Sequence, residues 1–227
     1  MLPIDLVIIG AGGQGRECLD IVQAMNEDGA ACFNVAGFVD DSPSTNDREL
    51  TEAGGFPILG SVDSLLSSPR GTQACIGIGS GQVRRTIDER LESAGIESPV
   101  LIHPSSTLGS GVRLGPGTTI WSGARLTTNI AIGRHVHINQ NVTIGHDCSV
   151  SDYATVNPQA AVSGTVWLGK ASLIGAGAVV LQGLTIGDDA TVGASACVTR
   201  DVDERGRVIG VPARDMPHRR AGRPHDD

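Results

Sequence analysis

Aromatic residues are scarce in this chain. Two Trp, one Tyr and three Phe make up only 3% of its 227 residues, whereas glycine contributes 31. Glycine is therefore roughly twice as frequent as its usual share of ~7%. Few rings and many glycines indicate a thin, repetitive core of aliphatic side chains and argue against a thick globular core.

Basic charge and long apolar runs are also lacking. The 25 Asp and Glu outnumber the 17 Lys and Arg, for a net charge of −8, which argues against a nucleic-acid partner held through phosphates. No apolar run reaches the ~18 residues of a membrane span. Residues 1–15 carry no basic segment ahead of their apolar run. We therefore expect no signal peptide, no membrane association and a cytoplasmic location.

Paired cysteines are absent as well. The five cysteines are odd in number and scattered, and no two of them form a CxxC pair. This pattern predicts reduced, buried thiols rather than a disulfide framework. No His, Cys or Asp cluster has the spacing of metal ligands, so we expect no metal.

A six-residue repeat runs through the second half of the chain. Every sixth residue from Ile102 to Val198 is Leu, Ile or Val, at 17 consecutive steps, and the residue four places after each is small or aliphatic. A period of six does not fit an α-helix and indicates the hexapeptide repeat of a parallel β-helix. Three hexads form one triangular coil, so 17/3 gives about 5.7 coils, stacked ~4.8 Å apart.

The first half has the pattern of an α/β unit. Apolar runs at 5–9, 34–39 and 74–78 indicate buried strands, and helical apolar periods fall within 17–25 and 83–91. This order, strand–helix–strand–turn–strand–helix, predicts a small parallel sheet. We assign the unit to residues 1–98, which is about half the length of a full dinucleotide-binding fold.

A glycine-rich loop follows the first predicted strand. Its sequence, Gly10-Ala11-Gly12-Gly13-Gln14-Gly15, has the G-x-G-x-x-G form in its required place between strand and helix. Its glycines let the backbone approach a ligand, and the helix N-terminus favours phosphate. Two interpretations stay open for Asp40 and Asp41 after the second strand: they hydrogen-bond a ribose or base edge, or they form a solvated turn.

Six motifs in order link the two halves to one family. They are the glycine loop, Gly37-Phe38-Val39-Asp40-Asp41, Gly77-Ile78-Gly79, Ile102-His103-Pro104-Ser105, Gly145-His146-Asp147-Cys148 and Gly210-Val211-Pro212-Ala213-Arg214. With them, nearly the whole chain resembles the bacterial nucleotide-sugar acetyltransferases, which include the bacillosamine-pathway and perosamine N-acetyltransferases and the sialic acid O-acetyltransferases.

The resemblance implies a fold, an assembly and an activity. The fold is an α/β half-Rossmann-like nucleotide-binding domain (1–98) followed by a left-handed parallel β-helix (99–214), and we expect the polar tail (215–227) to be disordered. The assembly is a homotrimer with active sites between subunits. The activity is transfer of an acetyl group from acetyl-CoA to a nucleotide-linked sugar.

The resemblance also implies catalytic and cofactor-binding residues. His146 falls at a coil corner and matches the family's general base, and Asp147 matches the acid that orients it. On their own, both residues have the alternative interpretation of polar corner residues. The residues implied to contact the cofactor are Asn139, Thr155, Gly164, Ala176 and Ala194. Position 155 departs from the family, in which it is often His.

The acceptor site is expected in the first half. We expect Gly12, Gly13, Gln14, Gly15, Asp40, Asp41, Gly79 and Ser80 to hold the nucleotide of the sugar. N-acetylation of an amino sugar is the favoured reaction, because this half is suited to hold a nucleotide. O-acetylation of a sialic-acid-type sugar, an NAD-dependent oxidoreductase and a non-catalytic scaffold are the alternatives.

Overall fold

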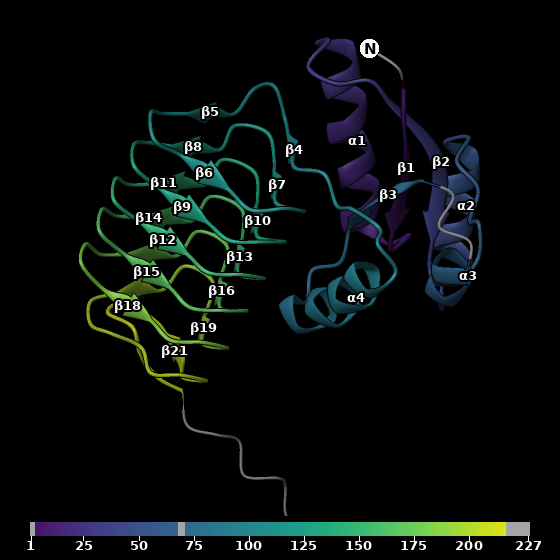
Figure 1. Ribbon diagram of the computed structural model, residues 1–227. Coiled ribbons are helices and arrows are strands. Elements are labelled where there is room, and N and C mark those ends of the chain that lie inside the picture. Colours follow the sequence, from purple (N-terminus) through teal and green to yellow (C-terminus); the bar gives the residue numbers. More distant parts are fainter. Residues whose placement is uncertain (1–2, 68–70, 217–227) are drawn as a thin grey trace, which may run out of the picture.

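The computed structural model describes residues 3–67 and 71–216. Figure 1 shows two parts side by side, an α/β unit coloured purple to blue and a stack of coils coloured teal to yellow. None of the helices in these ranges combines the length and the apolar character that a membrane crossing requires.

The α/β unit is built around a three-stranded parallel sheet. β1 (Ile4–Ile9) lies at its centre, between β2 (Phe33–Val39) and β3 (Gln73–Ile76). The helices of the unit are α1 (Gly13–Glu27), α2 (Thr45–Ala53), α3 (Val62–Ser67) and α4 (Gly81–Ser93).

Both faces of this sheet are buried. Leu6 and Ile8 of β1 belong to one apolar cluster with Val22 of α1. Val7 and Ile9 point to the opposite face and belong to a cluster with apolar residues of α3 and α4. The last four residues of β1, from Leu6 to Ile9, are therefore all apolar because side chains of both orientations are covered by helices.

The parallel sheet follows the predicted order, but the segment between its second and third strands differs from the expectation. We expected a turn there, and the structure has α2 and α3. Thr51 is the one buried residue of α2, so this helix has no apolar period to reveal it.

The second half is the left-handed parallel β-helix implied by the resemblance. It contains seventeen two-residue strands, one for each hexad. They are β4 (Leu101–Ile102), β5 (Thr107–Leu108), β6 (Arg113–Leu114), β7 (Thr119–Ile120), β8 (Arg125–Leu126), β9 (Ala131–Ile132), β10 (His137–Ile138), β11 (Thr143–Ile144), β12 (Ser149–Val150), β13 (Thr155–Val156), β14 (Ala161–Val162), β15 (Trp167–Leu168), β16 (Leu173–Ile174), β17 (Val179–Val180), β18 (Thr185–Ile186), β19 (Thr191–Val192) and β20 (Cys197–Val198).

The strands stack into three flat faces. The eight-strand face begins with β4 and β7 and ends with β21 (Arg207–Ile209) and the antiparallel β22 (Arg214–Asp215). The six-strand face runs from β5 to β20, and the five-strand face runs from β6 to β18. Asp215, where we expected the tail to begin, is thus part of a strand, and residues 217–227 of that tail lie outside the described residues.

The predicted aliphatic residue of each hexad is the second residue of its strand and points into the coil. From Ile120 to Val198 these side chains are at most 5% exposed and form one continuous cluster. In most hexads the third residue after the aliphatic one, at the corner of the coil, adopts a left-handed backbone conformation, as at Asn129 (φ 55°) and Asp147 (φ 58°). Asn and Asp tolerate this conformation better than most residues, which explains their frequency at the corners.

The α/β unit covers the eight-strand face. The backbone N–H of Ile102 donates to Sδ of Met25 at 3.4 Å, and the side-chain amide of Gln140 donates to Glu17 at 3.1 Å. Trp121 is buried there, with its ring edge to face against His137 at a centroid distance of 4.9 Å. The other two faces carry no part of the described α/β unit (Figure 1).

Candidate active site

His146 occupies the corner between the six-strand and five-strand faces, directly after β11. Its Nδ1 lies 2.7 Å from Oδ2 of Asp147, and its side chain is 62% exposed. A ring held by one nitrogen and exposed to solvent leaves its other nitrogen, Nε2, free to meet a substrate. The structure therefore brings together the two residues predicted as catalytic.

A third residue, which the sequence reasoning missed, completes the arrangement. The side-chain amide of Asn129 donates to Oδ1 of Asp147 at 2.6 Å. Its hydrogen bond, together with the contact with His146, holds the pKa of Asp147 below its usual value. Asn129 lies 18 residues before Asp147, which is one full coil, so the repeat length would have identified it.

Gly164 lies beneath the ring of His146. A Cβ at this position would be 2.6 Å from Nε2 of His146, and a Cβ at Gly145 would be 2.6 Å from the backbone nitrogen of Gly164. The backbone N–H of Thr165 donates to the carbonyl of His146 at 2.7 Å. The ring thus rests on the backbone of the next coil because glycine occupies that position.

The other predicted cofactor-binding residues lie elsewhere on the coil. Ala176 and Ala194 are stacked at the corner between the eight-strand and six-strand faces, where the carbonyl of Ala176 accepts from Ser195 at 2.8 Å. Asn139 is close to this corner, is buried, and donates to the carbonyl of Val156 at 3.0 Å. The structure therefore does not unite these residues with His146 inside one chain.

Thr155 faces the α/β unit. It is buried in the eight-strand face, and its hydroxyl donates to the carbonyl of Gly79 at 3.3 Å. Gly79, Ser80 and Thr155 line a cleft of about 230 Å³ between α4 and the coils. The Ser80 hydroxyl caps α4 by accepting from the N–H of Val83 at 3.4 Å.

The glycine loop divides into an open part and a packed part. A Cβ at Gly12 or Gly13 would meet nothing within 4 Å, whereas one at Gly15 would lie 1.8 Å from the carbonyl oxygen of Gly10. Gly15 therefore packs α1 against the strand, and Gly12 and Gly13 leave the start of the helix accessible. The amide nitrogen of Gln14 lies 3.1 Å from Nδ1 of buried His137, between the two parts.

Asp40 and Asp41 both form hydrogen bonds within the α/β unit. Oδ2 of Asp40 accepts from the N–H of Ala11 at 2.8 Å and thereby holds the glycine loop. Oδ1 of Asp41 accepts from the N–H of Val62 at 2.8 Å, at the start of α3. Asp40 thus holds the glycine loop, whereas Asp41 holds the start of α3.

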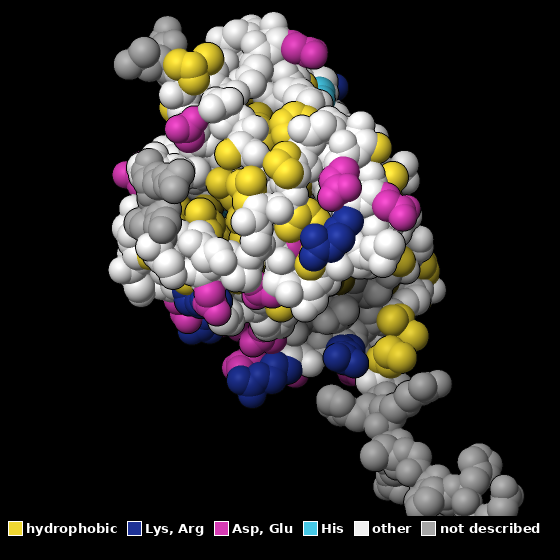
Figure 2. Space-filling view, turned by 90° about the vertical axis from the view of Figure 1, so that its right-hand side faces the viewer, with side chains coloured by type: hydrophobic (Ala, Val, Ile, Leu, Met, Phe, Trp, Pro, Cys, Tyr) yellow, Lys and Arg dark blue, Asp and Glu magenta, His cyan; other side chains and the backbone are white. Residues whose placement is uncertain are grey.

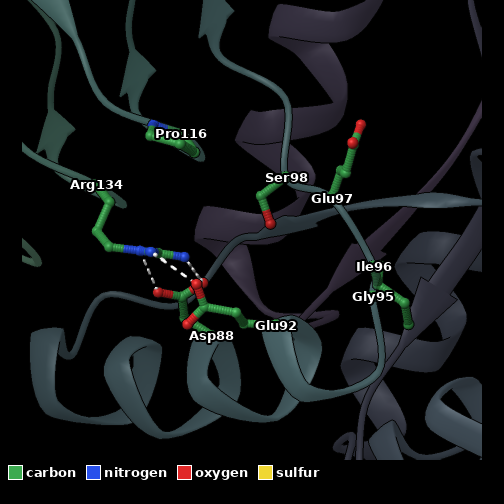
Figure 3. Close-up of a pocket in the computed structure, with 8 residues that line it drawn as sticks. All are labelled: Asp88, Glu92, Gly95, Ile96, Glu97, Ser98, Pro116 and Arg134. Carbon is green, nitrogen blue, oxygen red and sulfur yellow. Dashed lines mark hydrogen bonds and ion pairs between the residues drawn. The ribbon is translucent and has the colours of Figure 1, made fainter.

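A cleft of about 510 Å³ opens beside the C-terminal end of α4. Figure 3 shows Arg134, from the coil, reaching across to Asp88 and Glu92 of the helix. Burial opposes ionisation of Asp88, but its contacts with His135, Arg134 and Tyr153 outweigh this and hold its pKa below the ordinary value. The cleft therefore has an ion-paired wall that ties the two parts together.

The described residues contain no group of three or more His, Cys, Asp or Glu that could hold a metal ion. Figure 2 shows the face of the molecule that carries the α/β unit. On it, Lys and Arg side chains are scattered among Asp and Glu and form no continuous basic patch.

The exposed His146–Asp147 pair thus lies at a corner of a β-helix that is joined to an α/β unit. A family model described as the PglD N-terminal domain matches residues 5–91. Perosamine N-acetyltransferase from Caulobacter crescentus, solved with CoA and GDP-perosamine, is 30% identical, with a TM-score of 0.83 and coverage of 93% of this chain and 96% of that one. The acetyltransferase domain of PglB from Neisseria gonorrhoeae, solved with acetyl coenzyme A, is 28% identical, with a TM-score of 0.80 and coverage of 95% and 100%.

A third structure, WeeI from Acinetobacter baumannii, is 28% identical with a TM-score of 0.81 and covers 94% of this chain and 100% of that one. The similarity spans both the α/β unit and the β-helix. The chain belongs to the hexapeptide-repeat sugar acetyltransferases.

Proposed function

We propose that this enzyme transfers the acetyl group of acetyl-CoA to the amino group of a nucleotide-linked amino sugar, with His146 as the general base. The observation that carries the proposal is the exposed His146 ring, held at Nδ1 by Asp147 and supported by Gly164. The Caulobacter relative, solved with CoA and GDP-perosamine, supports the choice of substrates.

The hydrogen bond to Asp147 determines how His146 works. A carboxylate facing Nδ1 keeps the proton on that nitrogen and leaves Nε2 as an acceptor. The sugar amine attacks the thioester carbonyl, and Nε2 takes the proton that the nitrogen loses. The C–S bond then breaks, Nε2 passes that proton to the CoA sulfur, and an amide, a free thiol and a neutral His146 result.

Acetyl-CoA is proposed to lie along the corner that carries Ala176 and Ala194, close to Asn139. Small side chains at this corner leave the backbone accessible to an extended ligand. Because this corner and the corner of His146 are different edges of the β-helix, we propose that each active site lies between two copies of the chain, in a homotrimer. The cytoplasmic location expected from the sequence remains a prediction.

The nucleotide is proposed to bind at the N-terminus of α1, next to Gly12 and Gly13. These residues are open, and a helix N-terminus favours phosphate. Asp40 then acts by holding the loop through Ala11, and Asp41 acts through Val62. Gly79 and Ser80, which line the cleft near Thr155, are proposed to share this substrate pocket.

Thermal unfolding with a ligand panel tests the proposed substrates. The panel holds acetyl-CoA, CoA, NAD and the UDP-, GDP-, dTDP- and CMP-linked sugars. A ligand that binds only the folded state raises the melting temperature. At a concentration of 100 times its Kd, it adds about 2.7 kcal/mol to the free energy of unfolding. We expect a rise with CoA and with one nucleotide-sugar. A rise with NAD and none with CoA would instead support the oxidoreductase alternative.

A further inference from the structure

Arg84 of α4 is completely buried between the α/β unit and the β-helix. Its Nη1 donates to the carbonyls of Ile78 and Gly79 at 2.9 Å each, in the loop that leads into the helix. Its Nε and Nη2 donate to the coil. The acceptors there are the carbonyls of His135 (2.9 Å), Tyr153 (2.7 Å) and Ala154 (3.1 Å) and the hydroxyl of Thr155 (3.0 Å).

No carboxylate is among these six acceptors. Burial lowers the pKa of Arg84 to about 9. Taking an unpaired cation out of water is costly, and apolar residues of similar volume often stabilise a protein as well or better. The planar guanidinium, however, holds several oxygens in a fixed geometry that no apolar residue can reproduce. Its contribution here is therefore to geometry more than to stability.

Two other residues of α4 also fix the position of this helix against the β-helix. Gly81 lies three residues before Arg84, and a Cβ there would be 2.5 Å from the carbonyl oxygen of Tyr153. Asp88 lies four residues after Arg84 and accepts from the hydroxyl of Tyr153 at 2.7 Å. Residues three and four apart share one helix face, so Gly81, Arg84 and Asp88 together seat α4 against the coil.

We propose that Arg84 is a positioning residue that locks the Ile78–Ser80 loop onto the coil of Thr155 and so sets where a nucleotide-linked acceptor is held relative to the β-helix. The inference rests on the proposed function, because it assigns this loop to the acceptor. Arg84 lies beneath the loop and the coil and acts through them. The binding of acetyl-CoA, which is proposed for another corner, does not depend on it.

Steady-state kinetics of Arg84→Met and Arg84→Lys test this role. Arg85→Met is the matched control, because Arg85 is exposed on the same helix and, within residues 3–67 and 71–216, forms an ion pair with Glu89 alone. We expect Arg84→Met to raise KM for the nucleotide-sugar about tenfold or more and to leave KM for acetyl-CoA within about twofold. Arg84→Lys should lie between Arg84→Met and the unchanged protein, and the control should match the unchanged protein. A fall in melting temperature with both KM values unchanged would mean a structural role only and would overturn the proposal.

Hydrogen exchange separates this inference from the proposed function. The amides of Gly77 and Arg84, which donate to the carbonyls of Ile9 (2.8 Å) and Ser80 (3.0 Å) at the two ends of the loop, should be protected in the unchanged protein and exchange faster in Arg84→Lys while the β-helix stays protected. Unprotected amides in the unchanged protein, or no change in the variant, would overturn the role of Arg84 whether or not either variant is stable enough for kinetics. Protected amides in a protein without acetyl transfer would instead refute only the proposed function.

Discussion

At the scale of single residues, the site depends on what the coil corner does to ordinary side chains. Asp147 adopts a left-handed backbone conformation at its corner (φ 58°), and its carboxylate contacts both His146 and Asn129. Each interaction is local or one coil away. Because the repeat is regular, Asn129 lies next to Asp147 although the two are far apart in sequence, and Asp147 in turn holds the ring of His146.

Replacing His146 tests the role of the base. We expect His146→Ala and His146→Asn to lower kcat by about 10²–10⁴-fold, because general-base catalysis contributes that much. Asp147→Asn should give a smaller loss, since the ring keeps its place but loses the charged partner. Steady-state kinetics measure these effects, and circular dichroism checks that the fold is kept. Activity close to that of the unchanged enzyme in His146→Ala would show that another group removes the proton.

Gly164→Ala tests whether the ring must rest on the backbone below it. The added Cβ would meet Nε2 of His146 at 2.6 Å, so the ring must turn away. We expect kcat to fall about tenfold or more, with little change in KM. Gly54→Ala is the control, since its Cβ would meet ordinary contacts at 3.4 Å or more. Equal kcat in both variants would contradict the proposed ring position.

His137 should make the stability of the fold dependent on pH. Burial, reinforced by the nearby Arg84, lowers its pKa well below 6.5 in the folded protein. As pH falls below ~6.5, the unfolded chain binds a proton that the folded chain does not, so stability is present above that pH and is lost below it. The slope approaches about 1.4 kcal/mol per pH unit.

Urea unfolding at pH 7.5, 6 and 5 measures this slope. His137→Gln should flatten it between pH 6.5 and 5, because the titrating group is gone. His146→Gln, which changes an exposed ring, is the control and should keep the slope of the unchanged protein. An unaltered slope in His137→Gln would rule out His137 as its source.

At the scale of elements, the two halves differ in how well the sequence predicted them. All 17 hexads became strands at the expected positions because one short-range rule, an aliphatic residue every six, fixes each coil. Helix α2 was missed because its one buried residue, Thr51, gives no period. Arg84 lies on the apolar side of the predicted helix at 83–91, three residues before Ile87, but its role depends on contacts far along the chain.

Side chains that point into the coil should dominate stability. Ile144 is fully buried in the coil, and the neighbouring Thr143 points outward. Ile144→Ala should cost about 2–5 kcal/mol of unfolding free energy, because it leaves a cavity in a packed column. Thr143→Ala should stay within about 0.5 kcal/mol. Denaturant unfolding measures both, and similar costs for the two would contradict the inward–outward alternation.

At the scale of the whole molecule, the His146 corner and the Ala176 corner are separate edges of the β-helix, and the α/β unit covers the eight-strand face. The sequence indicated the residues of both corners, but it did not show whether the two corners lie close together within one chain. Their separation depends on the complete β-helix, and whether they share one active site depends on the proposed assembly.

The proposed trimer predicts complementation between two inactive variants. His146→Ala lacks the base, and Ala176→Arg places a bulky charge at the corner proposed for acetyl-CoA. Each alone should be inactive, but co-expressed copies should recover part of the activity, because some sites then combine intact edges. Native mass spectrometry should find three copies per particle. A monomer, or mixed assemblies without any recovery, would refute a site shared between copies.

Direct identification of the product tests the central claim of acetyl transfer to a sugar amine. The enzyme is incubated with acetyl-CoA and nucleotide-linked amino sugars, and the product is identified by mass spectrometry and NMR while free CoA thiol is followed. We predict one acetyl group on the sugar nitrogen and one equivalent of thiol, with neither formed by His146→Ala. Acetylation at a hydroxyl would favour the O-acetyltransferase, and acetyl-CoA left intact with every acceptor would contradict the account.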